Sequence, residues 1–220
     1  MAPIIHMSTE ASQLLLLLTW MSPAFPTGAF AYSHGLEWAI EQRNVTMCAE
    51  VRQWVEDLLT RGSGWNDAVL FARCWEDDAA ELNELALALA TSRERHLETS
   101  QIGRAFRIAA GVFAAPALDD EEIAYPVAAG SACAAMGIDR QHALLAWLQG
   151  FASTLTSVAV RLVPIGQTAG LEVLRDLAPV IARTAERAAS ATLDDLGAIT
   201  LSADIAAMKH ETQHSRVFRT

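Results

Sequence analysis

The end of the chain contains a pattern that could bind a metal. Its last eleven residues read HETQHSRVFRT, so that His210, Glu211 and His214 form the pattern H-E-x-x-H. On a helix this spacing places two histidines on one face with a glutamate beside them, which is the zinc site of many metalloproteases. The pattern alone therefore suggests a zinc metallohydrolase.

The rest of the tail argues against catalytic zinc. Such a site needs three protein ligands and one open position. Residues 215–220 include no ordinary zinc ligand, and the arginines at 216 and 219 would repel a cation. We therefore interpret the stretch as an exposed polar helix end, predict no metal ligand or catalytic residue, and keep a helical zinc metallohydrolase using HETQH as the alternative.

The composition restricts the possible functions. The 220 residues are 52% hydrophobic and 19% charged, and the formal net charge is −10. An acidic chain is poorly suited to nucleic acid, because binding to phosphates needs basic patches. Lys209 is the only lysine, and no polybasic segment could attract an anionic membrane. We therefore predict neither a nucleic-acid nor a membrane partner.

Cysteines and apolar runs indicate the compartment. Cys48, Cys74 and Cys133 are odd in number and far apart, which argues against a disulfide framework and suits a reducing environment. The apolar run at 14–18 is too short to span a bilayer. A secretory signal would need a Lys or Arg before such a run, and none is present. We expect a cytoplasmic protein.

The spacing of apolar residues predicts an all-α fold. They recur every three or four positions, and alternating runs typical of strands are absent. We expect one single-domain helical bundle of roughly eight to ten helices over 1–220, with a flexible N-terminus (about 1–9) and a flexible tail (about 212–220). Helices are predicted at about 10–21, 29–42, 46–59, 66–75 and 140–163, with others starting at Ser92, near Pro126, after Pro164 and at Ser202.

Two breaks and one arginine have structural interpretations. Pro23, Pro26 and Gly28 interrupt the helices near the N-terminus, and Gly28 can adopt dihedral angles closed to other residues. Pro164 and Gly166 end the long apolar helix, and the amide of Gln167 could bind backbone groups freed there. Arg161 lies in that apolar helix, so we expect it to be buried and paired, within the chain or at a dimer interface.

Three stretches carry a family resemblance. They read SPAFPTGAFAYSHGLE at 22–37, AVRLVPIGQT at 159–168 and DIAAMKHETQHSRVFRT at 204–220. In order, spacing and terminal position they closely resemble the UreF family of urease accessory proteins. SRERHLET at 92–99 and YPVAAG at 125–130 resemble weaker family segments, so the resemblance covers essentially the whole chain.

The resemblance implies an all-helical, typically dimeric protein without turnover of its own. Such proteins bridge the accessory protein UreD (also called UreH) to the GTPase UreG, and the assembly loads nickel into apo-urease in a GTP-dependent step. Nickel would pass through the complex and not remain as a bound cofactor. A helical adaptor unrelated to urease is a further possibility, which the neighbouring genes would distinguish.

The resemblance also implies partner-binding residues. Tyr32, with Ser33 and His34 at a helix start, is expected to engage the GTPase, and Glu37 could cap a helix, pair with an arginine or face a partner. The tail is expected to become ordered on UreD, with Phe218 and Arg216 contributing most. The full predicted set is Tyr32, Ser33, His34, Glu37, Lys209, His210, Glu211, Arg216, Phe218 and Arg219.

Overall fold

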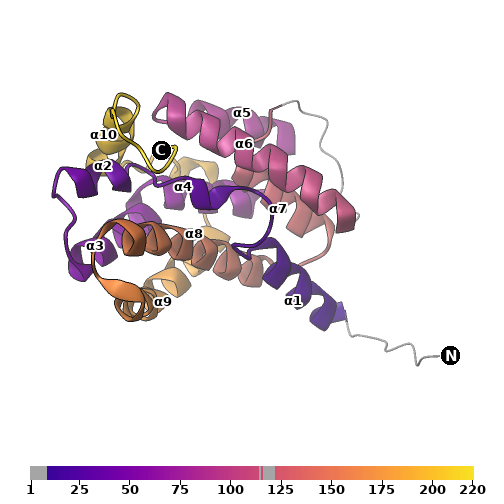
Figure 1. Ribbon diagram of the computed structural model, residues 1–220. Coiled ribbons are helices and arrows are strands. Elements are labelled where there is room, and N and C mark those ends of the chain that lie inside the picture. Colours follow the sequence, from indigo (N-terminus) through magenta and orange to yellow (C-terminus); the bar gives the residue numbers. More distant parts are fainter. Residues whose placement is uncertain (1–8, 114, 116–121) are drawn as a thin grey trace.

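The described part of the chain is almost entirely helical (Figure 1). The structure is a computed structural model that describes residues 9–113, 115 and 122–220. No strand occurs among these residues, which confirms the predicted all-α class. The ten α-helices are α1 (Thr9–Trp20), α2 (Leu36–Glu41), α3 (Cys48–Arg61), α4 (Ser63–Arg73), α5 (Ala79–Ala88), α6 (Arg93–Ala110), α7 (Tyr125–Ala135), α8 (Arg140–Leu162), α9 (Gly166–Ala189) and α10 (Leu201–His210). Short 3-10 helices occupy Ala29–Ala31, Gly111–Phe113 and Leu193–Asp195.

Several helix starts follow from their capping residues. The side chain of Ser92 accepts a hydrogen bond from the N–H of Arg95, and Asp139 does the same for His142, as expected of N-caps. Pro126 lies in the first turn of α7, where a missing N–H costs nothing. These three predicted starts are confirmed within one or two residues.

The α3 start differs from the prediction. Met47 and not Thr46 occupies the N-cap position, and its side chain makes no cap hydrogen bond. Instead, the carboxylate of Glu50 accepts a hydrogen bond of 2.6 Å from the N–H of Thr46. The first turn is therefore stabilised by the carboxylate of Glu50, which reaches back to the residue before the N-cap.

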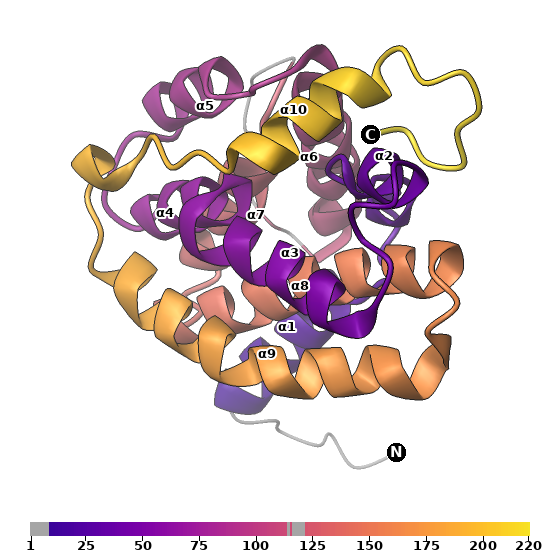
Figure 2. The same cartoon turned by 90° about the vertical axis from the view of Figure 1, so that its left-hand side faces the viewer.

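The core surrounds α8, which packs against α9, α3 and α4 (Figure 2). Leu144, Leu148 and Leu155 of α8 are completely buried. The ring centres of Trp147 and Phe71 lie 5.0 Å apart. By length and composition α8 is the one described helix that could cross a membrane. Half of its most apolar window is buried inside the protein, and a core helix of a soluble protein passes the same test.

Both predicted breaks occur, with two corrections. Gly28 and Gly166 adopt positive φ angles of 76° and 77°, which favour glycine. Gln167, however, is exposed, and the side-chain hydrogen bond expected for it is not among those of the described residues. Arg161 is also exposed and not buried, because it lies on the solvent side of the last turn of α8.

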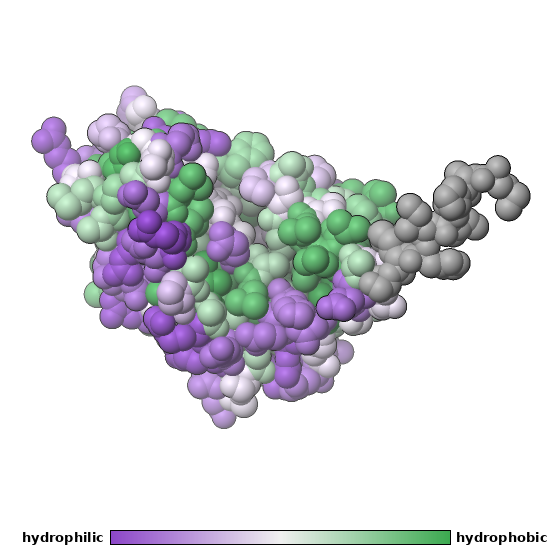
Figure 3. All heavy atoms as spheres, turned by 90° about the horizontal axis from the view of Figure 1, so that it is seen from below, coloured by the Kyte–Doolittle hydropathy of each residue, from purple (hydrophilic) through white to green (hydrophobic). Residues whose placement is uncertain are grey.

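An apolar groove lies beside α1. Leu14 and Leu18 of this helix are 56% and 63% exposed, and a hollow of about 870 Å³ separates them from α8 and α9. In Figure 3 hydrophobic residues gather on this side of the molecule. The expected flexible N-terminus falls on residues 1–8, outside the described residues, apart from Thr9, which begins α1.

Helix α1 and the C-terminus lie apart. The C-terminus is next to α2 and α6, whereas α1 lies at the opposite end of the molecule in Figure 1. The last ten residues, 211–220, are here called the tail. They leave α10 and return to the first turn of α2, where the predicted partner-binding residues gather.

Candidate functional site around the C-terminal tail

The site begins with a bend that sequence reasoning placed inside a helix. We expected one helix over 29–42, but the chain forms a 3-10 turn, bends at 32–35 and starts α2 only at Leu36. His34 and Gly35 have φ angles of 52° and 75°. An added side chain at Gly35 would lie 2.6 Å from the backbone nitrogen of Ala207, so close contact with α10 requires the glycine.

The bend leaves backbone N–H groups free at the start of α2, and the end of the tail binds them. The N–H of Ser33 donates to the carbonyl oxygen of Thr220 at 2.9 Å, and the Ser33 hydroxyl donates to the same oxygen. The N–H of His34 lies 3.3 Å from the Thr220 hydroxyl oxygen. Thr220 thus satisfies the backbone donors of the bend just before α2, and it is completely buried there.

Glu37 holds the tail one turn further along α2. One carboxylate oxygen accepts from the N–H of Val217 at 2.7 Å, and the other accepts from the N–H of Phe218 at 2.8 Å. The second oxygen also lies 3.2 Å from Nε2 of His210. Hydrogen bonds to an ionised carboxylate are stronger than neutral ones, so this buried side chain is a strong anchor.

His210 occupies the centre of a charged cluster. It is completely buried at the end of α10, with Nδ1 2.7 Å from Glu94 of α6 and Nε2 facing Glu37 of α2. The other oxygen of Glu94 accepts from the guanidinium of Arg216 at 2.6 Å. Helices α2, α6 and α10 and the tail are therefore joined through one histidine and two carboxylates.

A second buried cluster lies under Thr220. Glu98 contacts His34 Nε2 at 2.8 Å and Arg95 at 2.5 Å, and it accepts from the Thr220 hydroxyl at 3.0 Å. Asp67 of α4 lies 3.8 Å from Arg95 on the other side. One arginine thus faces two carboxylates in the interior, where an unpaired charge would be costly.

The surroundings shift the pKa values in this second cluster. Burial lowers the pKa of His34, and the positive charge of Arg95 lowers it further. Burial alone would raise the pKa of Glu98, but Arg95 and His34 outweigh it, and the pKa falls to about 2. For Asp67, burial raises the pKa to about 6, because the more distant Arg95 compensates only in part and Glu98 adds repulsion.

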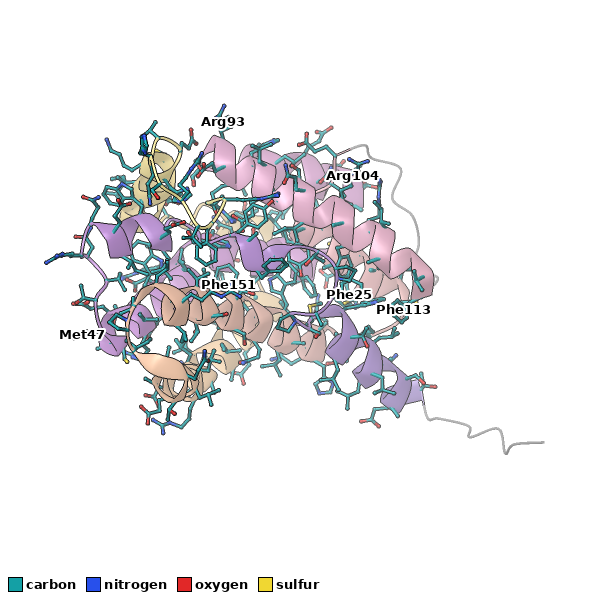
Figure 4. All side chains as sticks on the ribbon, in the orientation of Figure 1. Phe25, Met47, Arg93, Arg104, Phe113 and Phe151 are labelled. Atoms are coloured by element: carbon teal, nitrogen blue, oxygen red, sulfur yellow. The ribbon has the colours of Figure 1, made fainter. Side chains whose placement is uncertain are left out.

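The same cluster forms one wall of a cavity of about 280 Å³. Residues 22–30 and the exposed side of α8 form the other walls, and Phe151 packs edge-on against His34 at 4.9 Å between ring centres. Figure 4 labels Phe151 on α8 and Phe25 on the segment that precedes the bend. Among the described side chains, no group of three or more His, Cys, Asp or Glu is arranged to hold a metal ion.

The H-E-x-x-H pattern does not lie on one helix. Helix α10 ends at His210, so His214 is in the tail and is exposed. The two histidines therefore do not share a helix face, which removes the geometric basis of a zinc site at HETQH. Our interpretation as an exposed polar helix end also needs correction, because His210 is an interior residue that holds three helices together.

The tail itself needs the same correction. We expected a flexible tail over about 212–220, but Phe218 is 5% exposed and belongs to the main core, and Thr220 is buried. The guanidinium of Arg161 lies 5.9 Å from the centre of the Phe218 ring, a cation–π contact in place of the expected carboxylate partner. The tail is packed because Glu37 and Glu98 supply the acceptors that its donors need.

The structure brings the predicted partner-binding residues together but places them differently with respect to solvent. Six of them are buried, namely Tyr32, Ser33, His34, Glu37, His210 and Phe218. Lys209, Arg216 and Arg219 are exposed, and Glu211 is half-buried and accepts from the N–H of Arg93. Direct contact of the whole set with a partner stays a prediction. In this structure the buried members position the tail, and the exposed members Lys209, Arg216 and Arg219 lie at the surface.

Sequence reasoning missed Glu94, Arg95, Glu98 and Thr220 as members of the site. A signal was present in the segment SRERHLET, where carboxylates at 94 and 98 are four residues apart and so share one helix face. Charged residues on a helix ordinarily face solvent, and only their partners from α2, α4 and the tail turn this face into an interior one.

The fold and the site together define an all-helical protein whose C-terminal tail is held on its own helices by buried carboxylates. Comparisons with known proteins show the family to which this all-helical protein belongs. The sequence model of the UreF family matches residues 45–178. A urease accessory protein UreF from Brucella ovis is 46% identical over 225 residues, covering 99% of this chain and 98% of the relative. One from Mesorhizobium japonicum is 47% identical over 214 residues, covering 94% and 96%. The chain belongs to the UreF family of urease accessory proteins.

Proposed function

We propose that this chain is a non-catalytic chaperone and adaptor in urease maturation. It bridges UreD (UreH) and the GTPase UreG and is required for GTP-dependent nickel insertion into apo-urease in the cytoplasm. The proposal is supported by relatives of nearly equal length that are named urease accessory protein UreF. Nickel is the cargo of the assembly in this proposal, and the chain keeps none as a cofactor.

One structural observation carries the proposal further. The three stretches that resemble the family, 22–37, 159–168 and 204–220, meet around the tail: Glu37 binds the backbone of Phe218, and Arg161 lies over its ring. Segments far apart in the sequence thus form one ordered surface. A preorganised surface avoids much of the entropy cost of ordering a loop on binding, which suits an adaptor.

The apolar groove beside α1 supports the homodimer that we predict. Its exposed leucines, Leu14 and Leu18, face a hollow that is mostly apolar in character, and a second copy would bury them. No nucleic-acid partner is proposed, because the formal net charge of −10 would repel the phosphates.

The first test is urease activation in a reconstituted system that contains apo-urease, UreD, UreG, nickel and GTP. Nickel content and urease activity are measured with and without this chain. We expect both to depend on it. Equal activation in its absence would refute the proposal.

A second test asks whether the tail is needed. A variant lacking residues 215–220 should fail to bind UreD and to activate urease. Because the deletion also exposes Glu37 and Glu98, its helix content and Tm must be measured alongside. Val217→Ala is the matched control, since this tail side chain is 73% exposed and its backbone bond to Glu37 remains. Normal activation by the deletion variant would show that the tail is not part of the interface.

A further inference from the structure

The outer face of α6 carries a stripe of exposed side chains that borders the tail-centred site. Arg93, Leu97, Gln101, Arg104 and Ile108 follow one another at spacings of four, four, three and four, so they share one helix face. All five are exposed, with Leu97 at 45% and Ile108 at 64%. In Figure 4 Arg93 projects away from the body at the start of α6, and Arg104 lies further along the same helix. This set, together with Arg219, is here called the basic strip.

The basic strip is positive on a protein that is strongly negative overall. The chain has 26 acidic residues against 16 Lys and Arg, yet the strip contains no carboxylate. The carboxylates of α6 point inward instead, where Glu94 binds His210 and Arg216, and Glu98 binds Arg95. No ion pair of the Arg93 or Arg104 side chain occurs among the described residues. The fold thus uses the acidic side chains of α6 internally, while Arg93 and Arg104 are exposed on its outer face.

The tail completes this surface. The guanidinium of Arg219 donates to the side-chain oxygen of Gln101 at 3.2 Å, and the hydroxyl of Tyr32 donates to the same oxygen at 2.8 Å. Arg219 therefore joins the middle of the strip only while the tail is seated. The backbone N–H of Arg219 is fixed as well, because it donates to the carbonyl oxygen of Ala31 at 2.7 Å.

The alternation of charge and apolar side chains indicates what could bind. Arg93 to Ile108 extends over roughly 22 Å, at a rise of about 1.5 Å per residue. A partner helix of about 15 residues has this length, and its leucines could cover Leu97 and Ile108 while its carboxylates meet Arg93, Arg104 and Arg219. Complementary charges increase the association rate and select the register. We propose that the basic strip binds an acidic amphipathic helix of a partner protein in the urease maturation assembly. This inference rests on the proposed function.

The test uses full-length chain with charge reversals. The double variant Arg93→Glu/Arg104→Glu is compared with Arg175→Glu/Arg183→Glu, which makes the same charge change on the exposed side of α9. Binding to UreD, to UreG and to apo-urease is measured at about 50 mM and about 300 mM salt. We expect the strip variant to lose roughly tenfold or more in affinity for one partner at low salt, and the difference to shrink at high salt. The α9 variant should bind normally, and both should keep the wild-type Tm.

Hydrogen exchange of that partner then locates the contact. The protected segment should be a helix with net negative charge, and replacing its Glu and Asp by Lys should restore binding to the Arg93→Glu/Arg104→Glu variant. If the two substitutions weakened binding only by disturbing the fold of this chain, reversing the charges of the partner would not restore it. Protection of a non-helical or basic segment would overturn the inference.

Other outcomes separate this inference from the proposed function. If the strip variant binds every partner normally while the wild-type chain still activates urease, the inference fails and the proposed function stands. If charge reversal changes only self-association of the chain, the strip is covered by a second copy and the inference fails as well. If the wild-type chain neither binds these partners nor activates urease, the proposed function itself fails.

Discussion

Glu37 on α2 accepts a hydrogen bond of 2.8 Å from the backbone N–H of Phe218, which lies 181 residues later in the chain. The glutamate is 5% exposed, and among the described residues the hydrogen-bond partners of its carboxylate are two N–H groups of the tail and the ring of His210. The bond therefore holds the tail in place. In return, the N–H groups of the tail offset the free-energy cost of burying the carboxylate.

Replacing Glu37 by Gln should loosen the tail. The amide keeps the shape but loses the charge, and it can accept through one oxygen where the carboxylate used two. We expect the free energy of unfolding to fall by about 2 kcal/mol, the size expected for hydrogen bonds to a charged group that is buried. Urea denaturation measures this loss, and trypsin should cleave faster after Arg216. Glu41→Gln, an exposed change on the same helix, should leave both unchanged. A tail that stays resistant to trypsin in Glu37→Gln would show that other contacts hold it.

Removing the Phe218 ring should lower stability more than shortening the neighbouring side chain of Val217. Phe218→Ala removes a 5% exposed ring from the main core and is expected to cost about 3 kcal/mol of stability. Helix content measured by circular dichroism should persist, because the tail is not helical. Val217→Ala provides the control, since its side chain is 73% exposed. Equal stabilities of the two variants would contradict the packed tail.

Two glycines with nearly the same backbone angle should respond differently to substitution. Gly35 and Gly28 have φ angles of 75° and 76°, so alanine is strained at both by about 1 kcal/mol. At Gly35 the new Cβ would also lie 2.6 Å from the nitrogen of Ala207, whereas nothing lies within 4 Å at Gly28. Gly35→Ala should therefore lower the Tm clearly more than Gly28→Ala and should separate α2 from α10. Similar Tm values would mean that α10 can shift at little cost.

Asp67 should make stability depend on pH between about 4 and 6. Its pKa is raised from 3.8 to about 6 in the folded chain, so in this range the folded state holds a proton that the unfolded state has lost. The contribution of Asp67 to stability therefore falls as pH rises through this window and then stays level. The side chain is 21% exposed, which screens part of the effect, and we expect a loss of roughly 2 kcal/mol.

Asp67→Asn tests this dependence, because asparagine resembles the neutral acid at every pH. The variant should be more stable than the wild type at pH 7.5, and the advantage should vanish near pH 4. Urea unfolding at the two pH values measures the difference. Asp194→Asn, on an exposed 3-10 turn, should show no such change. An Asp67→Asn variant less stable than wild type at pH 7.5 would mean that the attraction of Arg95 outweighs the burial of Asp67.

Most helices and the family can be recognised from the sequence alone, whereas the bend at 32–35 cannot. Apolar spacing and caps such as Ser92 and Asp139 act within one or two turns, so they can be read along the chain, and they predicted the all-α class and the long core helix α8. The three stretches at 22–37, 159–168 and 204–220 pointed to the family that the comparisons then showed.

Which charged side chains lie inside the protein depends on contacts between distant segments. Glu37, Glu94 and His210 look like surface residues in sequence, and Arg161 looks like a buried one, yet the structure reverses each of these assignments. A charged side chain is buried only where partners from other segments satisfy it. Those partners lie more than a hundred residues away, on α6, α10 and the tail, and no local pattern contains that information.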